Sequence, residues 1–405
     1  MRAINLVGGG VVGLACGVAL ARAGHAVTLF EPDDQRTAAS WGNAGHIATE
    51  QVAPLASPAA VRSAHRRLFA RGGALDLPLA RIAHWLPFAV RLLDRSTPRH
   101  FAAGSRALGG LLRESLPAWR RLVAAIGAPE LLAENGHLVA WETPETARAG
   151  RAAWAEADTG TATFRDADAA ELAAIGAVSQ VPIAGAIRFS GSGQVRDLSA
   201  LAAALERSFT AAGGRIVRER ATVAIVDGAA QVPGHPADLV LVAAGIGSRA
   251  LMAATGHTVP MIAERGYHLR AAADRWPAEL PPLVFEDRSM IVTRYAECVQ
   301  AASFVELNTP DAPPDPRKWE RLEAHVRALR LPIAGPFRRW IGSRPTLPDY
   351  LPAIGRSRRA GNLLYAFGHQ HLGLTLAPIT AEIVAALAAD ASPPVDLAPF
   401  DLARF

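Results

Sequence analysis

The stretch MRAINLVGGGVVG, residues 1–13, decides the fold. Residues 4–7 are an apolar run that predicts a short buried strand. The chain then enters a glycine-rich turn that matches G-x-G-x-x-G, with Gly8, Gly10 and Gly13 as its glycines and Val11 and Val12 between the last two. Gly8 would permit a tight turn, Gly10 would let the backbone approach a pyrophosphate, and Gly13 would let helix and strand pack closely.

The residues after this turn complete a dinucleotide-binding pattern. An apolar segment without proline predicts a helix that ends at Gly24, and Ala26–Phe30 predicts a second strand that ends in Glu31. A carboxylate at this strand tip would accept hydrogen bonds from ribose hydroxyls, and the helix N-terminus would face the phosphates. The same glycines would also suit a turn that binds nothing, but the order strand, glycines, helix, strand, acid favours a nucleotide site.

Composition limits the class of protein. The chain has 405 residues, of which 50% are hydrophobic, so it can form large cores. Its formal charge is +5 with Lys318 as the only lysine, and no basic run interleaved with aromatic residues indicates nucleic-acid binding. Cys16 and Cys298 predict reduced thiols and a cytoplasmic protein. The first strand begins almost at Met1, which predicts no signal peptide, and no uninterrupted apolar run predicts a spanning helix.

A second segment of small residues follows the first unit, at positions 38–47. Ser40 and Asn43 can hydrogen-bond a ligand there, while Ala44 and Gly45 allow its close approach. The alternative is a helix start capped by Ser40. With the G-x-G-x-x-G turn and Glu31, this S-x-x-N-A-G segment resembles the flavin-dependent amine oxidoreductases of the D-amino acid oxidase superfamily, most of all the bacterial D-amino acid dehydrogenase small-subunit type. The resemblance implies that residues 40–46 run along FAD towards its flavin.

The middle of the chain predicts further elements of both kinds. Helix is predicted at 198–211, and the apolar run 237–244 predicts a buried parallel strand whose end, Gly245, abuts FAD in the resembled family. Residues 260–307 predict an antiparallel sheet. Residues 77–93 predict an amphipathic helix, which could lie at a membrane interface or turn its apolar stripe towards the core.

The C-terminal part carries a second signature of the same family. R-P-x-x-P-D-x-x-P-x-I-G begins at Arg344, and a G-H-x-x-x-G element lies before the predicted helix 376–389. The resemblance places further cofactor contacts in this element, at Gly368, Leu372, Gly373, Leu374 and Thr375.

These patterns predict an α/β protein, and the resemblance implies that it has two interleaved domains. A Rossmann-like FAD-binding domain with a parallel sheet would comprise 1–60, 190–255 and 341–405. An α+β substrate domain built on an antiparallel sheet, with a helical insertion, would comprise 61–189 and 256–340.

The resemblance also implies the site residues. Oxidation of an amino acid requires a held carboxylate, and a guanidinium fork matches its two oxygens. The arginine of the R-P pattern has this role in the resembled family, which points to Arg344, although a structural ion pair is the alternative. His371 would direct a polar group into the site, or would bond backbone instead. Tyr267, with its neighbour His268, and His46 are further candidates.

The expected activity is that of an FAD-dependent dehydrogenase of D-amino or D-imino acids. D-proline and cis-4-hydroxy-D-proline are the favoured substrates, and a quinone or another acceptor would take the electrons. The C-terminal motif has no cysteine where monomeric sarcosine oxidases tether flavin, so FAD is expected to be non-covalent, and no metal ligands are assigned. Three alternatives stay open: an oxygen-using glycine- or sarcosine-type oxidase, a flavin subunit that works with partner subunits or at the inner face of the membrane, and a plain NAD-binding protein.

Overall fold

The N-terminal strand lies inside a six-stranded sheet, in a computed structural model that describes all 405 residues. In spatial order the strands are β10 (Arg215–Val217), β2 (Ala26–Phe30), β1 (Ala3–Val7), β13 (Leu239–Val242), β20 (Leu363–Phe367) and β19 (Ala353–Arg356). All neighbouring pairs are parallel except β19 with β20. The predicted Rossmann-like sheet is therefore present.

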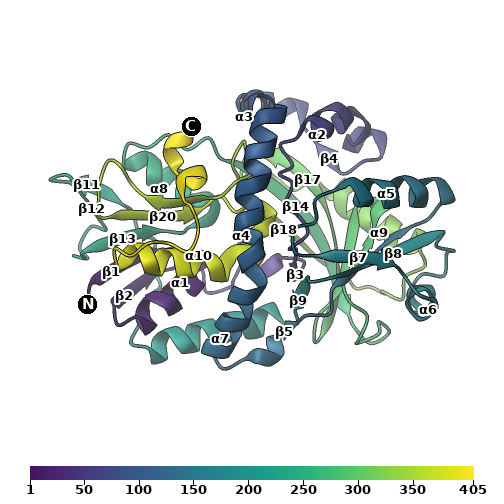
Figure 1. The fold of residues 1–405 in the computed structure, drawn as a ribbon, viewed down its shortest axis with the longest axis horizontal. Helices are drawn as coiled ribbons and strands as arrows, with labels where there is room; N and C mark the ends of the chain where they lie inside the picture. Colours follow the sequence, from purple (N-terminus) through teal and green to yellow (C-terminus); the bar gives the residue numbers. More distant parts are fainter.

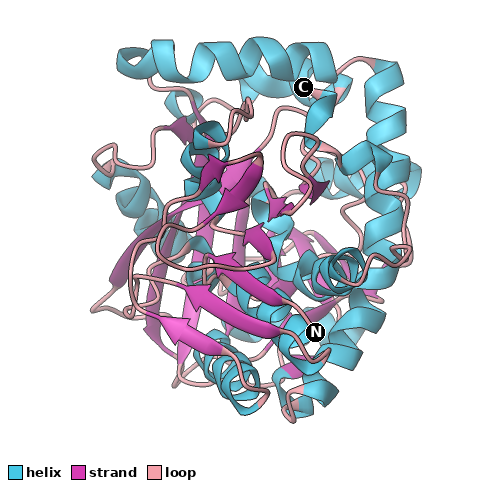
Figure 2. Cartoon of the chain, turned by 90° about the vertical axis from the view of Figure 1, so that its left-hand side faces the viewer, coloured by secondary structure: helices cyan, strands magenta, loops and turns pink.

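Both faces of this sheet are covered, which explains its continuous apolar strands. One face packs on helices α1 (Val11–Arg22), α7 (Leu198–Ala211) and α10 (Gly373–Ala388). The other face packs on α8 (Ser248–Ala254) and the hairpin β11 (Ala224–Val226) with β12 (Ala229–Gln231). Figure 2, viewed from the side of this sheet, shows the strands flanked by helices.

The second sheet has nine strands and is mostly antiparallel. They are β18 (Arg338–Thr346), β14 (Ile262–Ala272), β17 (Cys298–Asn308), β16 (Met290–Arg294), β15 (Leu283–Phe285), β6 (His137–Trp141), β8 (Gly185–Ser190) and β7 (Thr163–Asp166), with β4 (Leu75–Asp76) beside β17. The antiparallel sheet predicted for residues 260–307 is present at its centre. Two other pairs, β15 with β6 and β17 with β4, are parallel. Its helices are α5 (Pro144–Glu156), α6 (Ala169–Val178) and α9 (Pro316–Ala328).

A long helix, α4 (Pro98–Ala125), runs between the two sheets and packs against α10 (Figure 1). A small sheet of β3 (His46–Ile47), β9 (Gly193–Val195) and β5 (Leu132–Ala133) lies near its lower end. Helices α2 (Pro58–Ser63) and α3 (Ile82–Arg95) lie at the edge of the molecule beyond its upper end.

Several details differ from the sequence-based expectations. Helix α10 begins at Gly373 rather than residue 376. β18 crosses the predicted domain boundary at residue 341 and pairs with β14 along its whole length, while the remaining domain division stays a prediction. By length and composition, residues Gln370–Ala388 could cross a membrane, but 67% of the apolar window is buried inside the fold.

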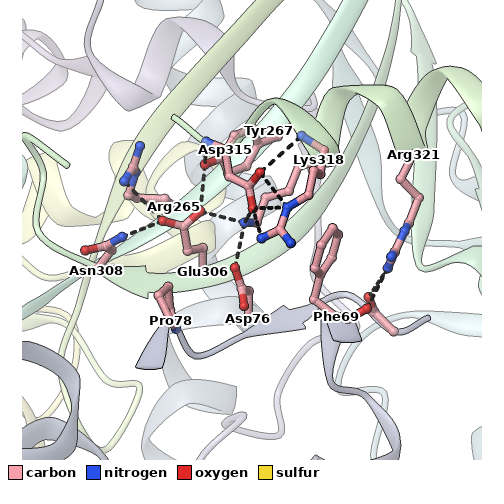
Figure 3. Close-up of polar contacts among 12 residues, drawn as sticks. Phe69, Asp76, Pro78, Arg265, Tyr267, Glu306, Asn308, Asp315, Lys318 and Arg321 are labelled. Atoms are coloured by element: carbon pink, nitrogen blue, oxygen red, sulfur yellow. Dashed lines mark hydrogen bonds and ion pairs between the residues drawn. The ribbon is translucent and has the colours of Figure 1, made fainter. Parts of the chain in front are cut away.

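A buried cluster of charges fastens α9 to strands β4, β14 and β17 of the second sheet (Figure 3). The ammonium of Lys318 is fully buried and lies 2.6 Å from Asp76, 2.9 Å from Glu306 and 3.1 Å from Asp315. Arg265 approaches the other oxygen of Glu306 at 3.1 Å. Burial of these ions is tolerable because each has a partner of opposite charge.

We expect Lys318→Met to lower the free energy of unfolding by about 3–5 kcal/mol, because it leaves buried carboxylates without their cation. Urea denaturation monitored by circular dichroism measures this change. Arg317→Ala is the matched control, since that side chain is 70% exposed and its pair with Asp315 should contribute little. Equal losses in both variants would contradict a special role for the buried ammonium.

Candidate functional site

The two sheets enclose one large cavity. It has a volume of about 1980 Å³ and is lined by the glycine turn, the end of β2, residues 37–44, the end of β13, β14, β18 and the loop before α10. Pockets for drug-sized ligands usually measure about 300–1,000 Å³. The cavity therefore has room for a dinucleotide and a small substrate beside it.

The glycine turn has the geometry that a pyrophosphate site requires. Gly8 has φ +112°, and a Cβ there would lie 2.5 Å from Cα of Ala244. A Cβ on Gly13 would lie 1.9 Å from the carbonyl oxygen of Gly8, so α1 can approach β1 this closely only without a side chain. The roles predicted for these two glycines are thus confirmed by the contacts.

Ser40 and Glu31 frame the same turn. The Ser40 hydroxyl accepts a hydrogen bond from the backbone N–H of Val11 at 3.1 Å, at the start of α1. The Glu31 carboxylate accepts from the N–H of Gly9 at 2.6 Å and of Asp33 at 2.9 Å. Ser40 therefore does not cap its own short helix, Ala39–Gly42, which has no side-chain cap.

The carbonyl groups of the segment after Ser40 are held by the second sheet. Trp41 C=O accepts from Arg270 at 3.0 Å, and Gly42 C=O accepts from His268 at 3.1 Å. Asn43 C=O accepts from the hydroxyl of Tyr295 at 2.6 Å and the amide of Gln300 at 2.9 Å. This segment therefore lies across the cavity in a fixed position.

Most predicted cofactor residues line the cavity. Those that do are Gly8, Gly10, Val12, Glu31, Ser40, Asn43, Ala44, Gly245, Gly368, Gly373 and Leu374. Those that do not are Val11, Gly13, Gly45, Leu372 and Thr375. The latter support the lining: the Thr375 hydroxyl, for example, accepts from the N–H of Ala48 at 3.1 Å. Helices α1 and α10 both begin at the cavity, which offers unpaired N–H groups to an anionic cofactor.

Arg344 lies on β18 at the cavity wall, and its side chain is 26% exposed. Its Nη1 donates to the Glu264 carboxylate at 3.2 Å and to the carbonyl of Phe304 at 3.1 Å. Nε and Nη2 have no partner within the protein. Two donor nitrogens of the guanidinium, with three N–H groups, therefore remain for a carboxylate ligand.

Glu264 is a site residue that sequence reasoning missed. Its side chain is 1% exposed, and it also accepts from the hydroxyls of Tyr350 at 2.9 Å and Thr346 at 3.3 Å. Burial and the neighbouring Glu264 hold the pKa of Tyr350 well above its usual value, so the phenol stays a donor. The available signal was a glutamate within a segment predicted to form a sheet, because acidic residues are uncommon in strands.

His371 also lines the cavity. Its Nε2 contacts Oε1 of Gln51, and burial lowers its pKa to about 4, with Arg344 adding to the shift. The imidazole is therefore neutral at pH 7. If Nε2–H donates to Gln51, Nδ1 is free to accept a hydrogen bond.

His46 belongs to a buried group that the sequence did not suggest. Its Nε2 lies 3.0 Å from Glu50, and Nε2 of His137 lies 4.0 Å from the same oxygen. Burial alone would raise the pKa of Glu50, but the two imidazoles bring it to about 2. The potential ligand atoms of His46, Glu50 and His137 lie within 4.8 Å of one another, a spacing that could hold a metal ion. The sequence analysis assigned no metal ligands.

Tyr267 also lines the cavity, but its hydroxyl is committed to another carboxylate. Its hydroxyl donates to Glu306 at 2.6 Å within the charge cluster of Figure 3, on the side of β14 that faces α9. His268 instead positions the segment that contains Gly42.

Comparison with known proteins agrees with this geometry. Residues 6–387 match the sequence model of a protein family, DAO, which is described as FAD dependent oxidoreductase. The chain belongs to this family.

Its members in the comparison include oxidases and dehydrogenases. A D-amino-acid oxidase of Bradyrhizobium diazoefficiens is 30% identical, with 100% of this chain and 99% of that protein covered. D-amino acid dehydrogenase 2 of Pseudomonas aeruginosa is 30% identical over 92% of both chains, and a D-amino acid dehydrogenase of Cereibacter sphaeroides is 28% identical over 99% of this chain and 95% of that protein. The chain is thus an FAD-dependent enzyme that oxidises D-amino acids or related amines.

Solved structures of other enzymes share the fold. Glycine oxidase from Geobacillus kaustophilus has a TM-score of 0.72 at 21% identity and covers 100% of both chains. L-proline dehydrogenase from P. horikoshii has a TM-score of 0.69 at 16% identity, with 100% and 97% covered. The family is FAD-dependent, and the glycine turn, Glu31 and the helix starts of this cavity are fit to hold FAD.

We expect the stability of this family member to fall on acidification. Burial lowers the pKa of His369 and of His137 to about 3, while unfolded histidine titrates near about 6.5. Between these values the unfolded chain binds more protons, so the free energy of unfolding falls as pH falls. His369→Gln should reduce the proton uptake on unfolding by about one, measured from urea midpoints at pH 6 and 5. An unchanged slope would contradict this assignment.

Proposed function

We propose that this enzyme is a dehydrogenase of D-amino or D-imino acids, with D-proline and cis-4-hydroxy-D-proline as the favoured substrates. Bound FAD would supply the hydride acceptor at flavin N5: the neutral substrate amine would lose a hydride from Cα and a proton from its nitrogen to solvent, and water would hydrolyse the resulting imine. FAD is held without a covalent bond in this proposal, since neither Cys16 nor Cys298 lines the cavity. A cytoplasmic location is part of the same proposal.

The observation that carries the proposal is the state of Arg344. One of its nitrogens is fixed by buried Glu264, and the other two donors are uncommitted beside the cavity. A guanidinium held at one corner is oriented before a ligand arrives, which reduces the entropy lost on binding. A substrate carboxylate is the anion that this fork matches.

Two further side chains support a small substrate. Tyr350 is 5% exposed and lines the cavity beside Arg344, so its phenol reduces the space next to the clamp. His371 is neutral at pH 7 and offers an acceptor for a substrate amine or hydroxyl. A compact cyclic imino acid fits these limits better than a long side chain.

We expect Arg344→Ala to raise the substrate KM by about tenfold to a hundredfold, because two charge-assisted hydrogen bonds are lost. Its flavin spectrum should remain, since Arg344 lies outside the glycine turn. Arg339→Ala is the matched control: Arg339 is on the same strand but pairs with Glu323, away from the clamp. Unchanged steady-state kinetics in Arg344→Ala would refute the clamp.

Anaerobic mixing with a panel of D-amino acids tests the substrate class. In this proposal, D-proline and its 4-hydroxy derivative should bleach the flavin faster than D-alanine, whose methyl side chain fills less of the space beside Tyr350. Fast bleaching by D-alanine but not by the cyclic compounds would overturn the favoured substrate and leave the D-amino acid activity. No bleaching by the isolated protein would favour a subunit that requires partners.

A quinone is the proposed acceptor, and an oxygen-using amine oxidase is the second candidate. The second candidate is favoured by the relative named a D-amino-acid oxidase, at 30% identity. Comparison of peroxide release with quinone or dye reduction distinguishes the two.

A further inference from the structure

Helix α3 has a second apolar face that nothing in the protein covers. One face is buried through Trp85 and Phe88, which pack with Ile262 and Leu307. On another face, side chains spaced by three or four residues are open to solvent: Ile82 is 44% exposed, Leu86 45%, Val90 58% and Leu93 53%. Leu79, just before the helix, is 80% exposed.

This exposure is concentrated in one part of the chain. Ten large hydrophobic side chains are exposed in the whole protein, and six of them lie between residues 55 and 93. They are Leu55, Leu79, Ile82, Leu86, Val90 and Leu93. Contiguous exposed apolar patches usually mark a contact with another molecule or a membrane.

The same part of the chain carries the positive charge of the protein. Residues 58–100, named here the α2–α3 surface, contain eight arginines and two aspartates, a formal charge of +6, whereas the whole chain has +5. Arginines elsewhere are commonly paired with carboxylates, but among these eight only Arg95 has such a partner, Asp94. Arg62, Arg66, Arg91 and Arg99 are exposed. The charge on this surface is therefore available to an anionic partner.

The cavity opens beside this surface. Leu55 and Leu93 belong both to the exposed apolar set and to the cavity lining, and Arg66 and Arg67 also line the cavity. A molecule bound to the α2–α3 surface would therefore lie at the cavity mouth.

The surface is held firmly from below. Asp76 of β4 pairs with buried Lys318, and the guanidinium of Arg321 donates to the carbonyl of Phe69 at 2.9 Å (Figure 3). The indole of Trp85 donates to the carbonyl of Pro78 at 2.9 Å. These contacts fix the start of α3, so its apolar stripe cannot simply fold inwards.

We propose that the α2–α3 surface binds an anionic lipid bilayer, with α3 in the interfacial plane and the cavity mouth at the membrane. An uncovered apolar stripe flanked by arginines is the pattern of interfacial helices. Anionic headgroups neutralise the arginines, whereas a second copy of the chain would bring a surface of +6 against another of +6. A lipid-soluble acceptor would then reach the cavity from the bilayer, a consequence that rests on the proposed function.

Co-sedimentation of the holoenzyme with vesicles tests the docking itself. Binding should be strong to an equal mixture of phosphatidylglycerol and phosphatidylcholine, weak to phosphatidylcholine alone, and reduced by salt. The double substitution Leu86→Ser, Val90→Ser should reduce binding at least tenfold, as should Arg62→Glu with Arg91→Glu. None of these four residues lines the cavity.

The matched control is Ile225→Ser with Val226→Ser, which removes two exposed apolar side chains far from α3 and should leave vesicle binding unchanged. Equal binding to neutral and anionic vesicles, or binding insensitive to the α3 and arginine substitutions, would overturn the proposal. So would a dimer in analytical ultracentrifugation that Leu86→Ser, Val90→Ser dissociates.

The docking and the proposed function fail separately. Flavin bleaching by D-amino acids in solution should be the same in wild type and Leu86→Ser, Val90→Ser, while reduction of a quinone dissolved in the vesicles should fall in the variant. Vesicle binding without any bleaching would leave the docking standing and remove the function. Bleaching without vesicle binding would do the reverse.

Discussion

The relation between the two sheets depends on three consecutive carbonyl groups, those of Trp41, Gly42 and Asn43. Side chains of the second sheet donate to all three. A buried carbonyl left without a donor is costly, so the loop cannot move away from β14 and β17 without losing several hydrogen bonds together. Since the same loop brings Ser40 to the start of α1, this set of bonds fixes the nucleotide turn against the substrate side of the cavity.

The pairing of Arg344 with Glu264 solves a conflict between rigidity and availability. An arginine satisfied on all sides would be well ordered but unable to bind a carboxylate. An arginine without a protein partner would bind only after losing side-chain entropy. Buried Glu264 takes one corner of the guanidinium and is itself held by Tyr350 and Thr346, so the fork is oriented while two donors remain.

Local patterns in the sequence predict the nucleotide-binding elements of the fold. Most features that they do not predict depend on how strands distant in sequence pair with one another. The glycine turn, Glu31 and the strand before Gly245 are readable because each depends on a few adjacent residues. The contact of Glu264 with Arg344 depends on how β14 pairs with β18, across 80 positions of sequence. Tyr267 follows an irregularity in the pairing of β14 with β17, and no local pattern indicates which face it takes.

The exposure of the α2–α3 surface also depends on contacts that are distant in sequence. Periodicity identifies an apolar stripe on α3, but whether that stripe is buried depends on which residues the sheet contacts, and the sheet contacts Trp85 and Phe88 instead. Below the helix, Asp76, Glu306 and Asp315 balance the buried cations, because an unpaired buried charge would be too costly. Above the helix, the arginines are solvated by water, so they do not require a carboxylate partner. A protein that pairs its buried charges so completely and leaves seven neighbouring surface arginines without carboxylates has a surface suited to an external anion.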